Sequence, residues 1–530
     1  MQGGFCMQEA DDPKFSSRVS LNAVSNVLRT AIMAVTGLIM VPYYIGEMGF
    51  GIYAVIFLAT TITTYFVAVS DSIAQAFTRY MTLSMNRGDL EDSNRVFSTT
   101  FIGMLRCVLV MTAVCAILSI SAPYVFNTGD ATALDVQMLF FMVLVASLML
   151  SFSSCLGSVF MACNKMYIMY VAKTVYILVQ IAVVVAVFEL FGPSLIVIGA
   201  SNVVAAIVCL AIMAFYIPRV APGLKASRSR YDPVLLKEMG GLAIWTLLSE
   251  IGSLLFIHAS LIVVNLIAGN EEQAVFSIVA NVASMVGTVC TAMSAAAVPL
   301  AYRCYSEKDM DGMERTLKLF SKTVGSLMAF VLAFLTVFAP QVIGVWLGQG
   351  YDEVIPLMRA ILPVEVVVCA AGALIDVPVL FVRMRMVAIF TGVMGAMNIG
   401  LAALILLFTD FGLMGVCWAW ALTVGIMKFV FYPVLAGRLL GKGSFAFHPP
   451  FLISLALYAV SVVVLHLFSI AFEMPTSLIL LAVVALSSMA IYVVASVRLV
   501  FSKDERSELV TYLPMSMQSI AGKLLLGKSA

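Results

Sequence analysis

Long apolar runs alternate with short polar breaks along this chain. The runs are roughly 20 to 30 residues long, enough for a helix to cross about 30 Å of hydrocarbon. Turn-forming pairs such as Gly192-Pro193 and Gly269-Asn270 occupy the breaks. We therefore predict fourteen membrane-spanning helices, at 18–45, 51–83, 96–121, 135–162, 167–190, 194–217, 239–268, 273–301, 319–346, 354–381, 386–408, 412–437, 450–470 and 477–499.

Composition agrees with an all-α polytopic membrane protein. Of 530 residues, 62% are apolar and 11% charged, whereas a soluble domain has about 25% charged residues. The net charge of +1 does not favour nucleic-acid binding. The ten cysteines form no CxxC pair, so no metal site or cofactor is predicted, and those inside apolar runs are expected to behave as small reduced hydrophobes.

The loops differ in charge according to their order. Loops after the odd-numbered helices contain no Lys or Arg. The alternate loops carry the basic residues Arg87, Arg95, Lys165, Arg219, Lys225, Arg228, Arg230, Lys308, Arg315, Arg383, Arg385, Arg438 and Lys442. Because short basic loops stay in the cytoplasm, both termini are predicted to be cytoplasmic.

The two halves of the chain have similar patterns when shifted by 224 residues. Arg79 then falls on Arg303, and Gly88 falls on Gly312. We predict two pseudo-symmetric six-helix bundles plus a terminal helix pair. The predicted divisions are an N-terminal lobe at 1–224, a C-terminal lobe at 225–448, and helices 13 and 14 with a cytoplasmic tail at 449–530. Six helices return the chain to its starting side, so the repeats are parallel, an arrangement known in transporters.

One-sided polar stripes run along several of the predicted helices. The stripe of helix 1 is Asn22, Asn26, Arg29 and Thr36, and its shifted counterpart on helix 7 is Thr246, Glu250, Ser253 and Ser260. Helix 8 carries Asn281 on a similar Ser- and Thr-rich face. Such a stripe must face protein or water. Close packing between helices is one explanation, and a polar cavity is the other.

Ionisable residues within the apolar runs favour the cavity. Arg29, Asp71, Glu250 and Glu365 are deep in their helices, where a charge costs at least a few kcal/mol. Arg106, Lys173, Asp376 and Lys428 are nearer the cytoplasmic ends, and Lys173 is interpreted as a structural ion pair. A structural pair stays an alternative for each deep charge. We predict a water-filled cavity with a basic bias among helices 1, 2, 7 and 8, holding Arg29, Asp71, Arg79, Glu250 and Arg303.

Short sequence motifs carry a family resemblance. The segment SLNAVSNVLRTAIMAVTGLIMVPYYIGEMGFGIYAV has Pro42, Gly46, Gly49 and Tyr53 at the junction of helices 1 and 2, and LIVVNLIAGNEEQAVFSIVAN is the corresponding junction of the second half. Both resemble the polysaccharide-exporter branch of the multidrug/oligosaccharidyl-lipid/polysaccharide superfamily, which includes O-antigen-type flippases. The chain departs from the family at Asn265, where many members carry Asp.

This resemblance implies a flippase of the bacterial cytoplasmic membrane. Its substrate would be an undecaprenyl-diphosphate-linked oligosaccharide, moved to the outer leaflet by alternating access for lipopolysaccharide or other cell-surface polysaccharide biosynthesis. Arg29, Arg79 and Arg303 would bind the diphosphate, because guanidinium binds phosphate bidentately. Sugar contacts are expected at Asn22, Asn26 and Asn281. Asp71 or Glu250 would carry a coupling H⁺ or Na⁺, with His258 either joining that relay or only packing.

Other functions remain open at this point. They are a cation-coupled multidrug exporter or a peptidoglycan-precursor flippase on the same fold, a membrane glycosyltransferase, polymerase or ligase, and a non-transporting scaffold. The outer loops are short and lack His and basic residues, so no enzyme is predicted. Membrane lipids, a polysaccharide polymerase and chain-length proteins are the expected partners. The GKLLLGKS tail at 522–529 matches a phosphate-loop pattern, but no helix follows it to bind phosphate.

Overall fold

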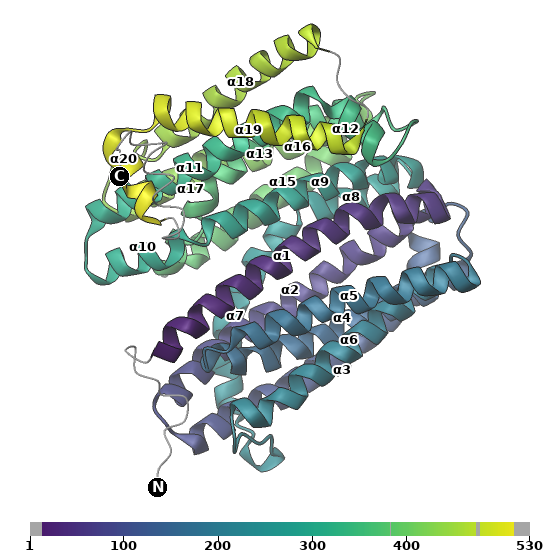
Figure 1. The fold of residues 1–530 in the computed structure, drawn as a ribbon. Coiled ribbons are helices and arrows are strands. Elements are labelled where there is room, and N and C mark those ends of the chain that lie inside the picture. Colours follow the sequence, from purple (N-terminus) through teal and green to yellow (C-terminus); the bar gives the residue numbers. More distant parts are fainter. Residues whose placement is uncertain (1–12, 382, 473–476, 513–530) are drawn as a thin grey trace. The chain divides into compact units, whose positions relative to one another are not determined.

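The computed structural model describes residues 13–381, 383–472 and 477–512, and these ranges contain helices and no β-strand (Figure 1). Thirteen helices are long and apolar enough to cross a membrane, and one bent pair raises the number to 14. The predicted fold class, an all-α polytopic membrane protein with about fourteen spans, is confirmed. The GKLLLGKS tail and Cys6 lie outside the described residues.

The helices form two compact units. Unit 1 contains the described residues up to Ser277 together with Met384–Gly412, and unit 2 contains Ile278–Arg383 together with the described residues from Leu413 onward. Three helices of the predicted C-terminal lobe, at 233–254, 257–267 and 384–408, therefore pack with unit 1. Packing does not test the sequence repeat, so the lobes at 1–224, 225–448 and 449–530 stay a prediction.

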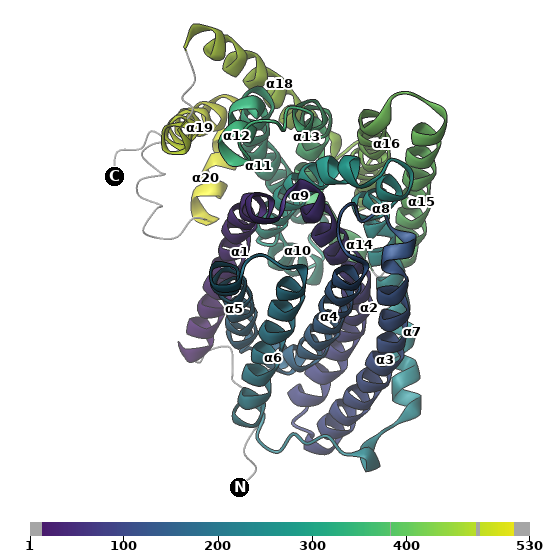
Figure 2. The same ribbon diagram turned by 90° about the vertical axis from the view of Figure 1, so that its right-hand side faces the viewer.

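Unit 1 is built around α4, which packs against both α2 and α6 (Figure 2). Helices α7 and α8 continue the unit by packing on α2, and α15 packs on both of them. The elements of unit 1 are α1 (Pro13–Met48), α2 (Phe50–Asn86), α3 (Leu90–Val125), α4 (Ala133–Ala162), α5 (Met166–Phe191), α6 (Leu195–Val220), η1 (Arg228–Arg230), α7 (Pro233–Leu254), α8 (Ile257–Ile267), the first turns of α9 (Asn270–Ser294), and α15 (Met384–Phe408).

Unit 2 is built around α11, which packs against α10, α12, α13, α18 and α19. Its elements are the rest of α9, α10 (Ala297–Ser306), α11 (Met310–Val337), α12 (Ala339–Trp346), α13 (Val354–Ala371), η2 (Gly372–Leu374), α14 (Val377–Leu380), α16 (Gly412–Gly425), the π-helix η3 (Ile426–Phe431), α17 (Tyr432–Leu439), α18 (His448–Ala471), α19 (Leu478–Val500) and α20 (Lys503–Tyr512).

Short polar residues begin several helices. The Asp89 carboxylate accepts hydrogen bonds from two N–H groups in the first turn of α3, and Asp232 does the same for α7, where Pro233 follows. Thr132 caps α4 by accepting from the Asp135 N–H. These caps satisfy backbone donors that a helix cannot pair internally, so the loop sequence fixes where each span starts.

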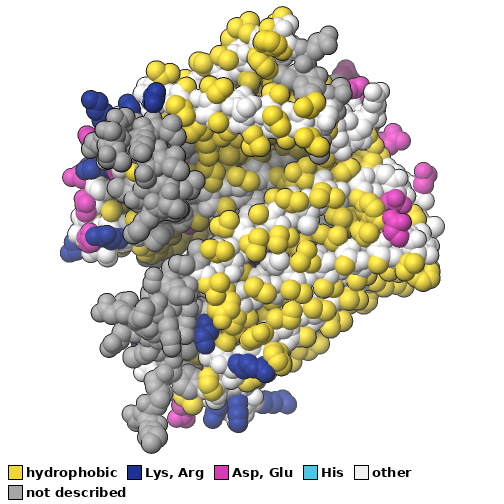
Figure 3. Space-filling view, viewed as in Figure 1, with side chains coloured by type: hydrophobic (Ala, Val, Ile, Leu, Met, Phe, Trp, Pro, Cys, Tyr) yellow, Lys and Arg dark blue, Asp and Glu magenta, His cyan; other side chains and the backbone are white. Residues whose placement is uncertain are grey.

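Each unit has one end where Lys and Arg gather (Figure 3). In unit 1 this basic end carries the loops with Arg87, Lys165 and Arg228; in unit 2 it carries those with Lys308 and Lys442. The opposite ends carry loops with acidic residues and no Lys or Arg, at 127–132 and 268–269 with Glu271 in unit 1, and at 347–353 in unit 2. We call these the basic and acidic ends.

The seventh predicted span is not one continuous helix. Residues 239–268 were expected to form a single helix, but α7 and α8 meet at a 49° bend around Leu255 and Phe256. The fully buried Asn398 of α15 donates hydrogen bonds to the carbonyls of both residues, at 3.2 and 2.8 Å. Unpaired carbonyls are costly in an apolar interior, and the Asn398 amide supplies donors to both, while the Ser260 hydroxyl also donates to the Phe256 carbonyl at 2.6 Å.

One pair of cysteines also departs from the expectation. Cys290 of α9 and Cys369 of α13 form a disulfide within unit 2, so the expected reduced state is wrong for this pair. The two are 79 residues apart in sequence, and no spacing motif marks them. The seven other described cysteines are free, in keeping with their apolar surroundings.

Candidate functional site

A polar layer crosses unit 1 between two apolar clusters. One cluster, toward the acidic end, contains Leu58, Phe140 and Phe188. The other, toward the basic end, contains Phe77 and Phe160. The layer between them on α2, α4, α5 and α6 consists of Ser70, Asp71, Ser72, Ser151, Ser153, Ser154, Lys173, Tyr176, Ser201 and Asn202. Most of the serine hydroxyls in this layer donate to carbonyls of their own helices, so the charged Asp71 and Lys173 are what distinguish the layer from ordinary helix packing.

Asp71 is at the centre of a charged cluster in this layer. Its carboxylate is attracted by Lys173 of α5 and repelled by Glu250 of α7, and it lies near Ser154 of α4. Lys173 in turn interacts with Arg29 of α1. Four helices of unit 1 thus contribute two cations and two carboxylates to one site.

The four charges share one level along the membrane normal. Counted from Met48, Phe50, Phe191 and Ile267 at the acidic ends of their helices, Arg29, Asp71, Lys173 and Glu250 are 17 to 21 residues away. At 1.5 Å per residue this is about 26–32 Å. Arg29, Asp71 and Lys173 are nearer the basic ends of their helices, whereas Glu250 is midway between Pro233 and Ile267. Helix α1 also begins at Pro13, five residues before the predicted start at 18.

The Arg29 guanidinium has an N–H group that can still donate a hydrogen bond. Its Nε is buried and has no hydrogen-bond partner within the described part of the chain. Its guanidinium carbon is 5.9 Å from the centre of the Tyr170 ring, which contributes a weak cation–π attraction. A buried guanidinium N–H without an acceptor favours binding of an anionic group.

Two predicted contacts on helices 1 and 2 lie outside this cluster. Asn22 is buried, donates to the Asn164 Oδ1 at 2.9 Å and accepts from the Tyr167 N–H at 2.8 Å. It thereby fastens α1 to the turn between α4 and α5. Arg79 is exposed on α2, two turns beyond Asp71 toward the basic end. The predicted sugar contact of Asn22 and phosphate contact of Arg79 stay predictions.

Asn26 and His258 flank the cluster along the chain. Asn26 is half-buried on α1, three residues before Arg29. His258 is half-buried on α8, just after the bend that separates it from Glu250. Its Nδ1 has no hydrogen-bond partner among the residues that the structure describes. Roles in sugar binding and proton relay stay predictions for these two residues.

The remaining predicted site residues belong to unit 2. Arg303 is exposed on α10 and pairs with Glu307 one turn later, Nε to Oε1 at 2.9 Å. Asn281 is half-buried on α9, and its Oδ1 has no partner in the described ranges. Their predicted place in one cavity with Arg29 and Asp71 stays a prediction.

Sequence reasoning missed part of the site. Lys173 was interpreted as a structural ion pair, and this stays a prediction: Asp71 attracts the Lys173 ammonium and Arg29 repels it. Ser154 was not singled out, because α4 shows no one-sided polar stripe in sequence. Its signal was the SFSS run at 151–154 inside an otherwise apolar helix.

An amide network ties together the acidic end of unit 1. Asn265 of α8 donates to the Asn127 carbonyl at 2.8 Å and to the Gln273 Oε1 at 3.0 Å, while its own Oδ1 accepts from the Asn127 N–H at 2.9 Å. Gln273 donates to the Ala54 carbonyl at 3.0 Å, and Asn270 donates to the Gly51 carbonyl at 3.0 Å. Helices α8 and α9 are thereby fastened to the start of α2 and the loop after α3.

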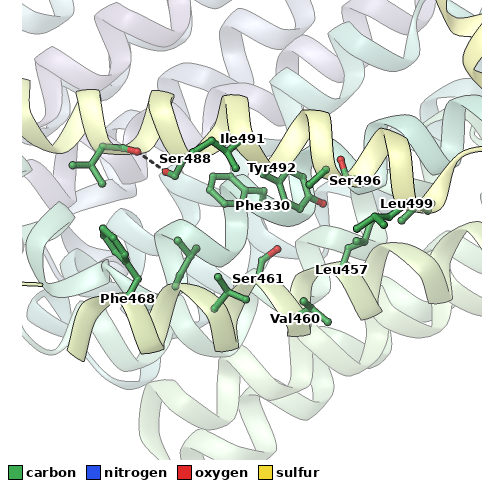
Figure 4. Close-up of a pocket in the computed structure, with 15 residues that line it drawn as sticks. Phe330, Leu457, Val460, Ser461, Phe468, Ser488, Ile491, Tyr492, Ser496 and Leu499 are labelled. Atoms are coloured by element: carbon green, nitrogen blue, oxygen red, sulfur yellow. Dashed lines mark hydrogen bonds between the residues drawn. The ribbon is translucent and has the colours of Figure 1, made fainter. Parts of the chain in front are cut away.

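Unit 2 contains an apolar groove between α18 and α19, with α11 at its base (Figure 4). Its volume is about 390 Å³. It is lined by Phe330, Leu457, Val460, Ser461, Val464, Leu465, Phe468, Val484, Ser488, Ile491, Tyr492, Ala495, Ser496, Leu499 and Val500. The Tyr492 hydroxyl donates to the Ser326 carbonyl at 2.7 Å, so it is occupied within the protein. Such a lining suits a hydrocarbon chain and not a sugar.

Comparison with known proteins identifies the family. A family model described as polysaccharide biosynthesis protein matches residues 18–304, more than half of the chain. The chain belongs to this family. The Bacillus subtilis (strain 168) protein described as uncharacterized membrane protein EpsK is 21% identical over 430 residues, which are 81% of this chain and 85% of the relative.

Solved structures show the same fold. A multidrug resistance MATE family transporter of the MOP superfamily, in an inward-facing conformation, matches with a TM-score of 0.63 at 15% identity over 79% of this chain and 98% of that one. A MOP superfamily transporter from Pyrococcus furiosus, with a binding pocket of reversed polarity, matches with a TM-score of 0.61 at 15% identity over 80% and 96%. The polysaccharide-exporter branch of this superfamily, expected from the sequence, is therefore confirmed, and this family member is a multi-pass membrane transporter.

Proposed function

We propose that this transporter moves an undecaprenyl-diphosphate-linked oligosaccharide from the cytoplasmic to the outer leaflet of a bacterial cytoplasmic membrane by alternating access. The observation that carries this proposal is the charged cluster of Arg29, Asp71, Lys173 and Glu250 at membrane depth in a member of a polysaccharide biosynthesis family. A diphosphate and its sugars cannot cross hydrocarbon unaided. They need a polar site of this kind.

The cluster suits a diphosphate because Arg29 and Lys173 can bind new anionic groups in place of, or in addition to, their present neighbours. Lys173 is balanced by Asp71, and the Arg29 Nε has no acceptor in the described ranges. An entering diphosphate would accept two hydrogen bonds from the Arg29 guanidinium and would compete with Asp71 for the Lys173 ammonium. Asp71 and Glu250 would then share a coupling H⁺ or Na⁺ that balances the released negative charge.

The apolar groove of unit 2 supports a lipid-linked substrate. A polyprenyl tail has no polar group to satisfy, so it would lie against Leu457, Val460 and Ile491 at little cost. The basic ends of both units would face the cytoplasm. In that orientation three of the four charges of the cluster in unit 1 lie nearer the leaflet in which the lipid-linked sugar is made.

Transport into vesicles tests the proposal. The protein is reconstituted into liposomes with a fluorescent undecaprenyl-diphosphate oligosaccharide, and translocation is read as loss of protection from a membrane-impermeant quencher. Native protein should translocate the probe, and Arg29→Ala should lower the rate at least tenfold because it removes a bidentate phosphate partner. Arg219→Ala is the matched control, since Arg219 is an arginine of the same unit that stacks on Phe215, 3.7 Å from that ring centre, away from the cluster.

Each outcome of this assay decides between the candidate substrates. Equal rates for native protein and Arg29→Ala would remove the assigned phosphate contact. No translocation by native protein, together with efflux of a cationic drug from the same vesicles, would replace the proposal by multidrug export. A preference for lipid-linked peptidoglycan precursor over the oligosaccharide would identify a precursor flippase instead.

A further inference from the structure

Unit 2 buries a carboxylate, that of Glu365, which the charged cluster of unit 1 does not include. Glu365 of α13 is 3% exposed, and its Oε2 has no hydrogen-bond partner among the described residues. It interacts electrostatically with Lys428 of the π-helix η3, which packs against α13. Glu365 does not cap a helix or lie in a loop, so neither of these ordinary structural roles accounts for a carboxylate buried in the middle of an apolar helix. A buried carboxylate oxygen without a hydrogen-bond partner among the described residues is costly, and such groups often have a function.

The two charges approach the same level from opposite ends of unit 2. Glu365 is 11 residues from the acidic end of α13 at Val354, or about 17 Å. Lys428 is 11 residues from the basic end of α17 at Leu439, also about 17 Å. Helical side chains lean toward the helix N-terminus, which for the run α16–η3–α17 is its acidic end. The four-carbon stem of Lys428 therefore carries its ammonium toward the level of Glu365.

The backbone at Lys428 can change the direction of this side chain. Ile426–Phe431 form a π-helix, which holds one more residue per turn than an α-helix. Converting this turn to α-helix shifts the residues before it by one position, which rotates side chains by about 100° around the axis. The Lys428 ammonium is now 4.8 Å from the Tyr432 ring centre, and this rotation would change its distance from Glu365.

Among the described residues of the elements packed against α13, the other charged groups are exposed, as Arg315 is, or already have partners. On α11, Lys318 pairs with Glu314, and Lys322 pairs with Glu505 at 2.8 Å. On α18, His448 packs against the rings of Phe429 and Phe445, His466 is exposed, and the Tyr458 hydroxyl bonds with Thr336. Helices α12 and η2 carry no charged side chain, and Arg359 on α13 itself donates to the Thr336 carbonyl at 3.0 Å.

We propose that Glu365 is a proton-binding site of unit 2, at which the Lys428 ammonium and a proton compete for one carboxylate. With Lys428 in place, the carboxylate is charged and balanced. When the π-helix rearranges and Lys428 leaves, a proton from water binds the Glu365 Oε2, so the buried side chain is never an uncompensated charge. Proton binding is thereby linked to the conformation of α16–η3–α17. Its use in driving export rests on the proposed transport function.

A substrate-free labelling experiment tests this site. Purified protein in liposomes is treated with dicyclohexylcarbodiimide, an apolar reagent that modifies protonated carboxyls, and labelling of Glu365 is measured by peptide mass spectrometry across pH. Labelling should increase as the pH falls. In Lys428→Met, which keeps the length but removes the charge, the midpoint should rise by about one pH unit or more because the competing cation is gone. Lys428→Arg should leave the midpoint close to the native value.

Controls separate proton binding from a purely structural pair. Glu365→Gln must lose the label, and Asp376→Asn, a change to a neighbouring carboxyl of the same chain segment, must retain it. Equal midpoints in native protein and Lys428→Met would overturn the competition. Protection of Glu365 by Na⁺ at constant pH would replace the proton by sodium.

A second measurement keeps the proposal falsifiable if the reagent does not reach Glu365. The pH dependence of probe translocation should flatten in Glu365→Gln. If Glu365 is unlabelled at every pH and this profile is unchanged, the proposal is wrong. Because labelling needs no substrate, its result stands even if the transported molecule is not a lipid-linked sugar.

Discussion

At the residue scale, charges inside the membrane are tolerated only when they are balanced. Asp71 lies beside Lys173 and Glu250, and Lys173 lies beside Arg29. Removing one charge leaves an uncompensated partner, which in buried pairs costs about 3–5 kcal/mol, whereas removing both partners can be nearly neutral. Comparing single and double variants can therefore distinguish the contribution of these charges to stability from their contribution to transport.

We expect Asp71→Asn to lower the melting temperature in detergent, because Lys173 and Arg29 then repel each other without a carboxylate between them. The double variant Asp71→Asn/Lys173→Met should recover most of that loss. Translocation of the fluorescent lipid-linked probe should stay defective in the double variant if the pair serves transport. Full recovery of both stability and translocation would make the pair purely structural.

We expect the stability of the protein to depend on the hydrogen-bond donors of the Asn265 side-chain amide. Asn265 faces two acceptors, the Asn127 carbonyl and the Gln273 Oε1, and both need a donor. Asn265→Asp keeps the shape but removes the donor, so we expect a loss of about 1–3 kcal/mol in unfolding free energy near neutral pH. Stability should partly return at low pH, where a protonated Asp donates again. A variant as stable as the native protein at neutral pH would show that the network contributes little.

At the element scale, the bend between α7 and α8 depends on α15. Asn398 donates to the carbonyls of Leu255 and Phe256 and to the Ser260 hydroxyl at 2.9 Å. Gly395 lies one turn earlier, where an added Cβ would come within 2.6 Å of the Leu255 Cβ and 2.8 Å of the Gly252 carbonyl oxygen. Close packing and the amide together hold the bend at 49°.

Asn398→Leu should therefore destabilise the protein by about 1–3 kcal/mol, measured as a fall in thermal stability in detergent. The reason is that the Leu255 carbonyl loses its donor, while the Phe256 carbonyl keeps the Ser260 hydroxyl. Asn281→Leu is the comparison. Because the Asn281 Oδ1 has no partner in the described part of the chain, its loss should affect stability much less. If both variants melt alike, the amide of Asn398 is not what holds the bend.

A well-formed ion pair links helix α20 to α11 of unit 2. Lys322 of α11 donates to both Glu505 oxygens, at 3.0 and 2.8 Å. Partial burial alone would raise the pKa of Glu505, but the hydrogen bonds from Lys322 and from the Ser502 N–H outweigh it and keep this pKa below its usual value. The contact is therefore at full strength above the ordinary titration range of a glutamate and weakens only in strong acid.

At the scale of the whole molecule, orientation follows from loop charge and is open to a direct test. Arg87 is at the basic end of unit 1 and Asp410 is at the acidic end. We expect Asp410→Cys to react with a membrane-impermeant maleimide in intact cells, above the background of the native cysteines. Arg87→Cys should react only after the membrane is permeabilised. The reverse pattern would place both termini outside and contradict the proposed direction of transport.

The sequence by itself determined the fold class, the number of spans and the positions of the deep charges. Apolar runs of membrane length cannot fold otherwise in lipid, where every backbone group must be satisfied within its own helix. It also predicted Arg29, Asp71 and Glu250 as ionisable residues within apolar runs, since a charge in such a run is visible without any neighbour.

Only the tertiary structure decided which of these residues meet. Lys173 is near enough to attract Asp71, and the π-helix that carries Lys428 packs against the helix of Glu365. Asn398 donates to the Leu255 carbonyl at the bend, and Cys290 is bonded to Cys369, all across long separations in sequence. Helical periodicity reports the face on which a residue lies but not the helix that covers that face. In a chain of similar apolar helices, pairing is decided by packing and by the polar groups that packing must satisfy.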